Sequence, residues 1–238
     1  MPPPATIEPL HVADVTLPEG HPLAGELCAV FAYLIRHADG PVLVDTGVGG
    51  RHDGIDRIYR PVRKPLANTL DEAGLHPSVI VAVINTHLHC DHCGENRLFP
   101  DTPIYVQAAE YEAAQDPLHT IREWIDFPGV RLEQLSGESE LLPGLSVLPT
   151  PGHTPGLSVL PTPGHTPGHQ SVLVEGEDGL SIIAGQAVYS AAEFAGASPP
   201  TEGEWDSEAY ARSLASLRGL APERVYFSHD ATVWTKEA

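Results

Sequence analysis

The chain contains 238 residues, of which 42% are hydrophobic, and carries a formal net charge of −19 because 32 Asp and Glu residues oppose 13 Lys and Arg residues. A chain of this length forms one large domain or two small ones around a substantial core. The negative charge repels phosphate backbones and anionic lipid surfaces, so we expect a protein that binds neither nucleic acid nor membranes. The longest apolar run, Leu27 to Ile35, spans nine residues, far fewer than the roughly 20 that a membrane-spanning helix needs.

The amino terminus and the cysteines indicate a cytoplasmic protein. The first residues, MPPPATIEPLH, have neither the basic nor the apolar region of a signal peptide. Three cysteines, Cys28, Cys90 and Cys93, make no paired disulfide framework, which is typical of a reducing compartment. Cys90 and Cys93 match a C-x-x-C pattern, but no second pair accompanies them, so we interpret the match as a coincidence.

The first half of the chain has mainly the pattern of short strands. Residues 28–37 and 41–47 predict the two strands of a hairpin, because both are rich in apolar residues and Ala-Asp-Gly lies between them. Residues 62–75 predict a helix with leucines along one side and a glycine near its end. Residues 79–86 form an apolar run that is typical of a strand buried on both faces.

The second half alternates strands and helices. Residues 102–115 predict a strand followed by a helix, and residues 171–185 predict a β-hairpin. Residues 207–220 predict a late helix with a serine at its N-cap, and residues 224–230 predict the last strand. Strands followed by helices in each half predict an α+β sandwich, two packed sheets covered by helices, in one domain that spans residues 1–238.

The segment NTHLHCDHCGEN, which begins at Asn85, is the most informative part of the chain. His87 and His89 are two residues apart at the end of a predicted strand, so the period of two points both rings to the same side. Asp91 and His92 follow where the chain must turn. Four ligand-type side chains within six residues suit a bound cation, and imidazoles and carboxylates are donors that zinc accepts.

The spacing H-x-H-x-D-H resembles the signature of the metallo-β-lactamase superfamily. Three further segments are similar to motifs of that family and follow in the same order: LVDTG at residues 43–47, TPGHTPGH at residues 162–169, and FSHD, which contains His229. The resemblance implies an αββα sandwich with the metal site at the edges of the two sheets.

The resemblance also implies a set of metal ligands. They are His87, His89 and His165 in a first metal site and Asp91, His92 and His229 in a second. The Asp of LVDTG, Asp45, would support the ligand histidines from behind. In the family a carboxylate bridges the two metals, whereas this chain has Gln186 at that place. Because glutamine is neutral, we expect fewer than two tightly bound ions per chain.

The branch of the family that this chain resembles hydrolyses N-acyl homoserine lactones. Tyr189, three residues after Gln186, matches a tyrosine that hydrogen-bonds the substrate carbonyl in that branch. The segment around Trp124 and Phe127 resembles an insertion that forms a wall of the lactonase pocket. The implied reaction opens a lactone or ester bond by attack of metal-bound hydroxide, with Asp91 orienting the water and carrying its proton.

Other activities share parts of this pattern. A glyoxalase-type thioesterase has the same ligands but binds an anionic conjugate through basic residues, which are few here. β-Lactamases usually follow a signal peptide, nucleases conflict with the negative charge, and diiron oxidoreductases carry Glu where His89 stands. The non-catalytic alternative is a protein that binds one metal and a small ligand with little turnover, because Gln186 replaces the bridging Asp.

The expected cofactor is Zn²⁺, at one or two ions per chain, although other divalent metals accept the same donors. The expected partner is a small-molecule substrate, and a homodimer is a candidate assembly because this branch often dimerises.

A tandem duplication interrupts the third motif. Residues 144–155, GLSVLPTPGHTP, are repeated letter for letter as residues 156–167, so His153 and His165 stand in identical surroundings. Only His165 leads directly into PGHQS and the next predicted strand, which is the order seen in the family. We therefore predict that the second copy supplies both the strand and the ligand, and that the first copy is extruded as a surface loop, since longer loops cost little.

Overall fold

The computed structural model describes residues 5–19, 21, 23–152, 167–199 and 206–236. The two histidines of the duplicated segment that compete for one metal position, His153 and His165, lie outside these ranges. Across the described ranges, no helix is long and apolar enough to cross a bilayer.

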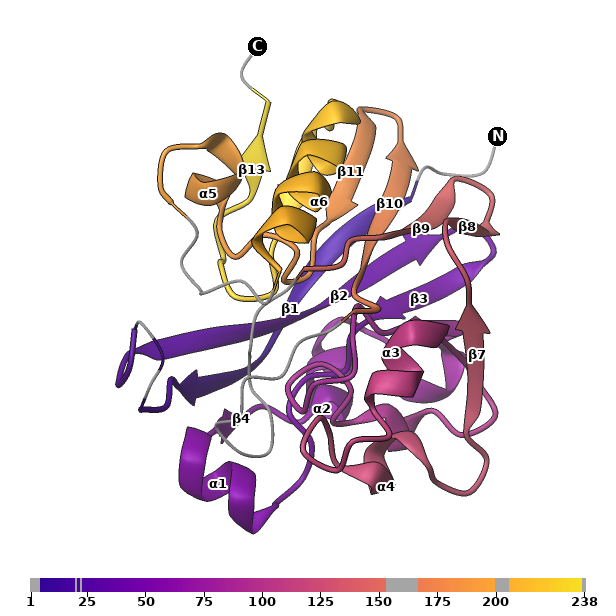
Figure 1. Ribbon diagram of the computed structural model, residues 1–238. Coiled ribbons are helices and arrows are strands. Elements are labelled where there is room, and N and C mark those ends of the chain that lie inside the picture. The colour runs from indigo at the N-terminus through magenta and orange to yellow at the C-terminus, as the bar shows by residue number, and fades with distance from the viewer. Residues whose placement is uncertain (1–4, 20, 22, 153–166, 200–205, 237–238) are drawn as a thin grey trace.

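Two β-sheets lie at the centre of the molecule (Figure 1). Within the described residues the larger sheet has seven strands, ordered β4 (Val62–Arg63), β1 (Thr6–Thr16), β2 (Leu27–His37), β3 (Gly40–Val44), β5 (Ala82–Ile84), β6 (Pro103–Gln107) and β7 (Arg131–Leu135). The smaller sheet has six there, ordered β13 (Trp234–Thr235), β12 (Arg224–Tyr226), β11 (Gly179–Ile183), β10 (Gln170–Gly176), β9 (Leu145–Pro149) and β8 (Ser139–Leu142).

Helices cover the outer faces of both sheets (Figure 1). The larger sheet carries α1 (Asp53–Tyr59), α2 (Leu66–Glu72), α3 (Ala108–Ala113) and α4 (Arg122–Ile125), and the smaller sheet carries α5 (Ala191–Ala195) and α6 (Ser207–Gly219). Two short 3₁₀ helices cover Pro77–Val79 and Asn96–Leu98. The predicted αββα sandwich is confirmed.

The alternation of side chains along the strands produces three apolar layers. In β2, Ala32 and Leu34 face the helices of the larger sheet, whereas Tyr33 and Ile35 face the smaller sheet. Valines of β9 and β10 complete the layer between the sheets, and the outer face of β10, β11 and β12 packs against α5 and α6. Central strands buried on both faces explain why these segments are apolar throughout.

Some predicted elements begin or end elsewhere. The helix expected over residues 62–75 is shorter, because Pro65 precedes its first turn and the residues before Pro65 pair with β1. The N-cap of α6 is Asp206 and not Ser207, since Oδ1 of Asp206 accepts two backbone N–H groups of the first turn. The prediction that residues 224–230 form the last strand is wrong, because β13 follows and pairs with β12.

The prediction that the second copy of the repeat supplies the strand is also wrong. The strand that pairs with β10 is β9, Leu145–Pro149, which belongs to the first copy. A tight turn at Gly144, with φ 74°, joins β9 to β8. Both copies have the same strand propensity. The first copy follows β8 directly, so pairing it with β8 closes a shorter loop and costs less conformational entropy than pairing the second copy would.

The end of the first copy is fixed against α6. The Ser213 hydroxyl donates a hydrogen bond to the carbonyl oxygen of Pro151 at 2.7 Å. A Cβ atom at Gly152 would lie 2.3 Å from the backbone nitrogen of Tyr210, so only glycine fits there. The chain is therefore fixed at Gly152, the last described residue of the first copy.

Candidate metal centre and active site

The loops that follow β3 and β5 meet at one edge of the larger sheet. These strands are parallel neighbours, so Asp45 and Thr86, which follow them closely, come together. Asp45 has φ 60°, which is rare for a residue other than glycine. Its Oδ1 accepts the backbone N–H of Thr86 and its Oδ2 accepts the Thr86 hydroxyl, both at 2.8 Å. The strained backbone aims the carboxylate at the second loop.

Asp45 also orients the ring of His92. Asp45 Oδ2 lies 2.8 Å from His92 Nδ1, and both side chains are buried. Because a carboxylate only accepts hydrogen bonds, Nδ1 carries a proton, and Nε2 on the other side of the ring is the nitrogen that could bind a metal. Metal-binding histidines commonly have this arrangement, in which a carboxylate behind the ring fixes the tautomer.

The free face of His92 is directed at Asp91 and His229. One ligand atom from each of these three buried residues lies within 4.8 Å of the others. Oδ2 of Asp91 is 3.4 Å from Nε2 of His92 and 3.5 Å from Nε2 of His229. His229 comes from the loop after β12, and its Nδ1 donates to the carbonyl oxygen of Ala29 at 2.8 Å. Two segments, the loop after β5 and the loop after β12, thus direct donor atoms at one point.

Several buried atoms at this point have no hydrogen-bond partner within the described part of the chain. They are both carboxylate oxygens of Asp91 and Nε2 of His92 and of His229. The side-chain oxygen of Gln186, whose backbone N–H contacts His169, is also buried without such a partner. More than about 90% of buried polar groups are hydrogen-bonded, so a cluster of exceptions needs a reason. A bound cation supplies one, and a set of imidazoles and carboxylates fits a divalent metal.

The charges of the cluster also shift its pKa values. Burial raises the pKa of the Asp91 carboxyl, but His92 and His229 outweigh it and hold that pKa below its usual range. Burial likewise opposes the charge on His92, yet Asp91 and Asp45 raise the pKa of His92 to about 10. The same negative field attracts cations, and a metal ion would displace the proton from His92.

The strand expected over residues 79–86 is shorter than predicted, because β5 ends at Ile84. His87 and His89 therefore lie in the loop that follows β5. Their rings nevertheless pack edge to face, with His87 Nε2 3.1 Å from His89 Nδ1. The ring centroid of His87 is 4.0 Å from that of His92. The structure therefore gathers the whole H-x-H-x-D-H signature and His229 into one buried group.

His169, the last residue of the third motif, lies beside this group. Its ring centroid is 5.3 Å from that of His87. The backbone N–H of Gln186 donates to Nε2 of His169 at 3.1 Å, and Nδ1 lies 2.9 Å from the hydroxyl oxygen of Thr150. Burial lowers the pKa of His169 to about 3, so the ring is neutral. Both ring nitrogens contact protein groups, and His169 thereby positions the peptide of Gln186.

A buried network of short polar side chains fixes the turn of the signature. The carbonyl oxygen of His92 accepts from the backbone N–H of Thr46 at 2.7 Å and from the Asn85 amide at 3.2 Å. Asn96 donates to Asn85 and accepts from the Thr46 hydroxyl, each at 2.9 Å. The sequence analysis assigned these three residues no role, although each lies within or next to a recognised motif.

Tyr189 lies at the edge of the cluster. Its ring stacks on that of His229 at a centroid distance of 5.6 Å and an angle of 28°. Its hydroxyl oxygen is 3.0 Å from the Cys28 sulfur at the start of β2. The backbone N–H of Tyr189 donates to the Glu193 carboxylate at 3.0 Å. The sequence analysis gave no role to Cys28 or Glu193, which hold the tyrosine from two sides.

Trp124 and Phe127 belong to the apolar layer between the larger sheet and its helices. Trp124 is 5% exposed, and a Cβ atom at Gly49 would come within 2.5 Å of its indole. Core packing therefore accounts for Trp124. Phe127 is half-buried and keeps an exposed face.

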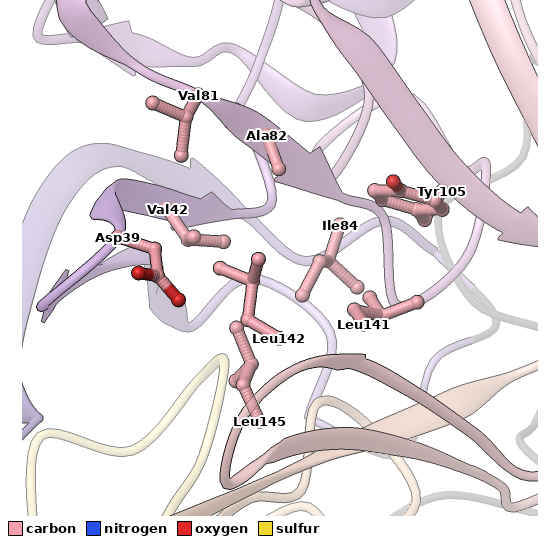
Figure 2. Close-up of a pocket in the computed structure, with 9 residues that line it drawn as sticks. All are labelled: Asp39, Val42, Val81, Ala82, Ile84, Tyr105, Leu141, Leu142 and Leu145. Carbon is pink, nitrogen blue, oxygen red and sulfur yellow. The ribbon is translucent and has the colours of Figure 1, made fainter.

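A small cavity of about 130 Å³ lies beside the beginning of β3 and β5, next to the β8–β9 hairpin (Figure 2). Its walls are mainly apolar and include Val42, Ala82, Ile84 and Leu142. None of the predicted metal, catalytic or pocket residues lines it.

The fold and the buried cluster of histidines and carboxylates define a metalloprotein of the αββα type. Residues 25–160 match the model of the metallo-beta-lactamase superfamily. The chain is 32% identical over 217 residues to an N-acyl homoserine lactonase of Bacillus sp, a match that covers 84% of this chain and 81% of that protein. A similar match, at 31% identity and the same coverage, is to an N-acyl homoserine lactonase of Bacillus cereus.

Solved structures agree with these matches. A quorum-quenching N-acyl homoserine lactone hydrolase superposes with a TM-score of 0.76 at 28% identity, over 96% of this chain and 93% of that one. Another N-acyl homoserine lactone hydrolase, with N-hexanoyl-L-homoserine bound at its catalytic metal centre, gives a TM-score of 0.74 at 27% identity, over 96% of this chain and 94% of that one. The chain belongs to the metallo-beta-lactamase superfamily.

Proposed function

We propose that this protein is a metal-dependent hydrolase that opens the ester bond of an N-acyl homoserine lactone. The observation that carries the proposal is the buried cluster of Asp91, His92 and His229, whose ligand atoms lie within 4.8 Å of one another beside the ring of Tyr189. The likeness to lactonases over most of the chain supports it.

The proposed cofactor is zinc. Its proposed ligands are His87, His89 and His165 in one site and Asp91, His92 and His229 in the other, with the amide oxygen of Gln186 where the family has a bridging carboxylate. A bound divalent metal lowers the pKa of water from about 15.7 toward about 7 and stabilises negative charge on a carbonyl oxygen. Because Gln186 is neutral, we propose one tightly bound ion and a weaker second one.

Asp91 and Tyr189 are the proposed catalytic residues. The carboxylate of Asp91, whose pKa is held low, accepts the proton of the attacking water as its oxygen bonds to the lactone carbonyl carbon. When the ring C–O bond breaks, Asp91 gives this proton to the leaving oxygen, which becomes the hydroxyl of the product. The Tyr189 hydroxyl donates a hydrogen bond to the carbonyl oxygen, where negative charge develops.

The charge of the chain favours a neutral substrate. An acyl homoserine lactone carries no charge, whereas an anionic glutathione thioester would approach a protein of net charge −19 against electrostatic repulsion. The exposed face of Phe127 is the proposed apolar wall for the acyl chain, and Trp124 supports it from the core.

A panel of substrates tests the proposal. Zinc-loaded protein is given N-hexanoyl homoserine lactone, a glutathione thioester and a β-lactam, and acid release is followed by pH-stat, with metal-stripped protein as the control. We expect hydrolysis of the lactone alone and none by stripped protein. Preferential thioester hydrolysis would identify a glyoxalase-type thioesterase. Bound metal without any turnover would identify a single-metal binding protein instead.

For assembly and location we propose a cytoplasmic homodimer that binds neither nucleic acid nor membranes. Analytical ultracentrifugation of the metal-loaded protein tests the dimer, and a monomer at micromolar concentration would exclude it.

A further inference from the structure

A buried pair of ionisable residues, Glu110 and His119, lies behind the first two histidines of the signature. Glu110 is in the first turn of α3 and is 0% exposed, and His119 is 6% exposed. Oε1 of Glu110 lies 2.8 Å from Nε2 of His119. Because a carboxylate accepts, the histidine donates, and the pair has a defined orientation.

The same carboxylate oxygen holds the backbone between the two histidines. The backbone N–H of Leu88 donates to Oε1 of Glu110 at 2.8 Å. Leu88 separates His87 from His89, so this bond fixes the peptide from which both rings project. A buried carboxylate is costly unless it is hydrogen-bonded. The loop and His119 both contact Oε1, whereas Oε2 is buried without a hydrogen-bond partner among the described residues.

His119 continues the contact to a ring of the signature. Its ring centroid is 4.8 Å from that of His89, at an interplanar angle of 46°. The His89 ring therefore faces His87 on one side and His119 on another, which restricts its rotation.

The first turn of α3 also contacts the segment that closes the third motif. A Cβ atom at Gly168 would lie 2.1 Å from the backbone nitrogen of Glu110 and 2.6 Å from its Cα. Gly168 immediately precedes His169, which holds the peptide of Gln186. One turn of helix thus contacts both the loop that carries His87 and His89 and the described end of the third motif.

We propose that Glu110 and His119 are positioning residues for the first metal site and that they set its affinity. The proposal rests on the proposed function for the identity of that site. Partners that stand behind metal ligands typically change metal affinity or activity by 10- to 100-fold when they are removed. Removing the carboxylate frees the Leu88 peptide and the His119 ring, so both histidines lose their fixed geometry.

Metal affinity is the direct test. Zinc dissociation constants are measured by competition with a chromogenic chelator for Glu110→Ala, Glu110→Gln and His119→Ala, and the cobalt-loaded proteins are compared by visible spectroscopy. We expect Glu110→Ala to bind zinc about 10- to 100-fold more weakly, with an altered cobalt spectrum. Glu110→Gln keeps an oxygen for the Leu88 N–H, so its loss should be smaller.

Glu95→Ala is the matched control. Oε2 of Glu95 accepts the backbone N–H of Leu66 at 3.1 Å, so this variant removes a half-buried carboxylate that holds the start of α2 and not the backbone of a proposed ligand loop. We expect a lower melting temperature and unchanged zinc affinity. Unchanged affinity and spectrum in Glu110→Ala would overturn the proposal, and so would an equal loss in Glu95→Ala.

If Glu110→Ala does not fold, Glu110→Gln and His119→Ala decide by the same two measurements. Weakened zinc binding in a protein that hydrolyses no lactone would leave this inference standing while the proposed function fails.

Discussion

The carboxylate of Asp45 should control metal binding through the tautomer of His92, and Asp45→Asn isolates this effect. Asp45 accepts three hydrogen bonds at 2.8 Å, from the Thr86 backbone N–H, the Thr86 hydroxyl and Nδ1 of His92. Asparagine has the same shape and tolerates the φ of 60° found here. Its amide nitrogen, however, can only donate.

The magnitude follows from these contacts. When the Asn nitrogen faces His92, Nδ1 must accept and the proton moves to Nε2, the atom that faces Asp91. Displacing that proton and losing the buried negative charge should weaken zinc binding by about 10- to 100-fold, or about 1.4 to 2.7 kcal/mol. Replacing hydrogen bonds to a charged group by neutral ones should lower the free energy of unfolding of metal-free protein by about 1 to 3 kcal/mol.

Chelator competition measures the zinc affinity, and urea unfolding of stripped protein measures the stability. Asp101→Asn is the control, because Asp101 also has a positive φ, 63°, and is exposed in the loop before β6. It should change neither quantity. If Asp45→Asn binds zinc as tightly as Asp101→Asn, the reasoning about the His92 tautomer is refuted.

Four further predictions concern catalysis, metal content and the repeat. Tyr189→Phe should lower kcat for a lactone by about 100-fold or more with metal content unchanged. Tyr105→Phe is the control, because Tyr105 lines the apolar cavity, which contains none of the proposed site residues, and it should have normal kinetics. Equal kinetics in both variants would contradict the role of Tyr189. Gln186→Asp should raise the zinc content measured after dialysis toward two ions per chain, and an unchanged content would show that charge at this position does not limit the second site. Removing either twelve-residue copy yields one and the same sequence, and this shortened protein should fold and retain zinc; a folded product without zinc would mean that the extra copy is required. In the full chain His165→Ala should abolish binding at the first site and His153→Ala should not, and the reverse result would identify His153 as the ligand.

The sequence by itself determined the elements and most of the cluster. The strand Leu27–His37 is apolar from Leu27 to Ile35 because both of its faces are buried over most of that length, and this pattern is visible in the sequence. The ligand-type residues of the signature lie within six positions, so local geometry alone brings them together. His229 was found through its resemblance to a family motif, since no local pattern connects it to residues over 130 positions away.

Only the tertiary structure decided which residues support the loop of His87 and His89 from outside the metal cluster. It also decided which copy of the repeat forms a strand. Glu110 and His119 carry no motif, and their position against Leu88 arises because β6 places α3 next to the loop that follows β5. His169 and His165 share one motif, yet the described contacts of His169 are with Thr150 and Gln186, which no sequence pattern indicates. The two copies of the repeat are chemically identical, so no property of the residues can rank them. Their ranking comes from the hairpin with β8 and the contact of Gly152 with α6, which exist only once the chain is folded.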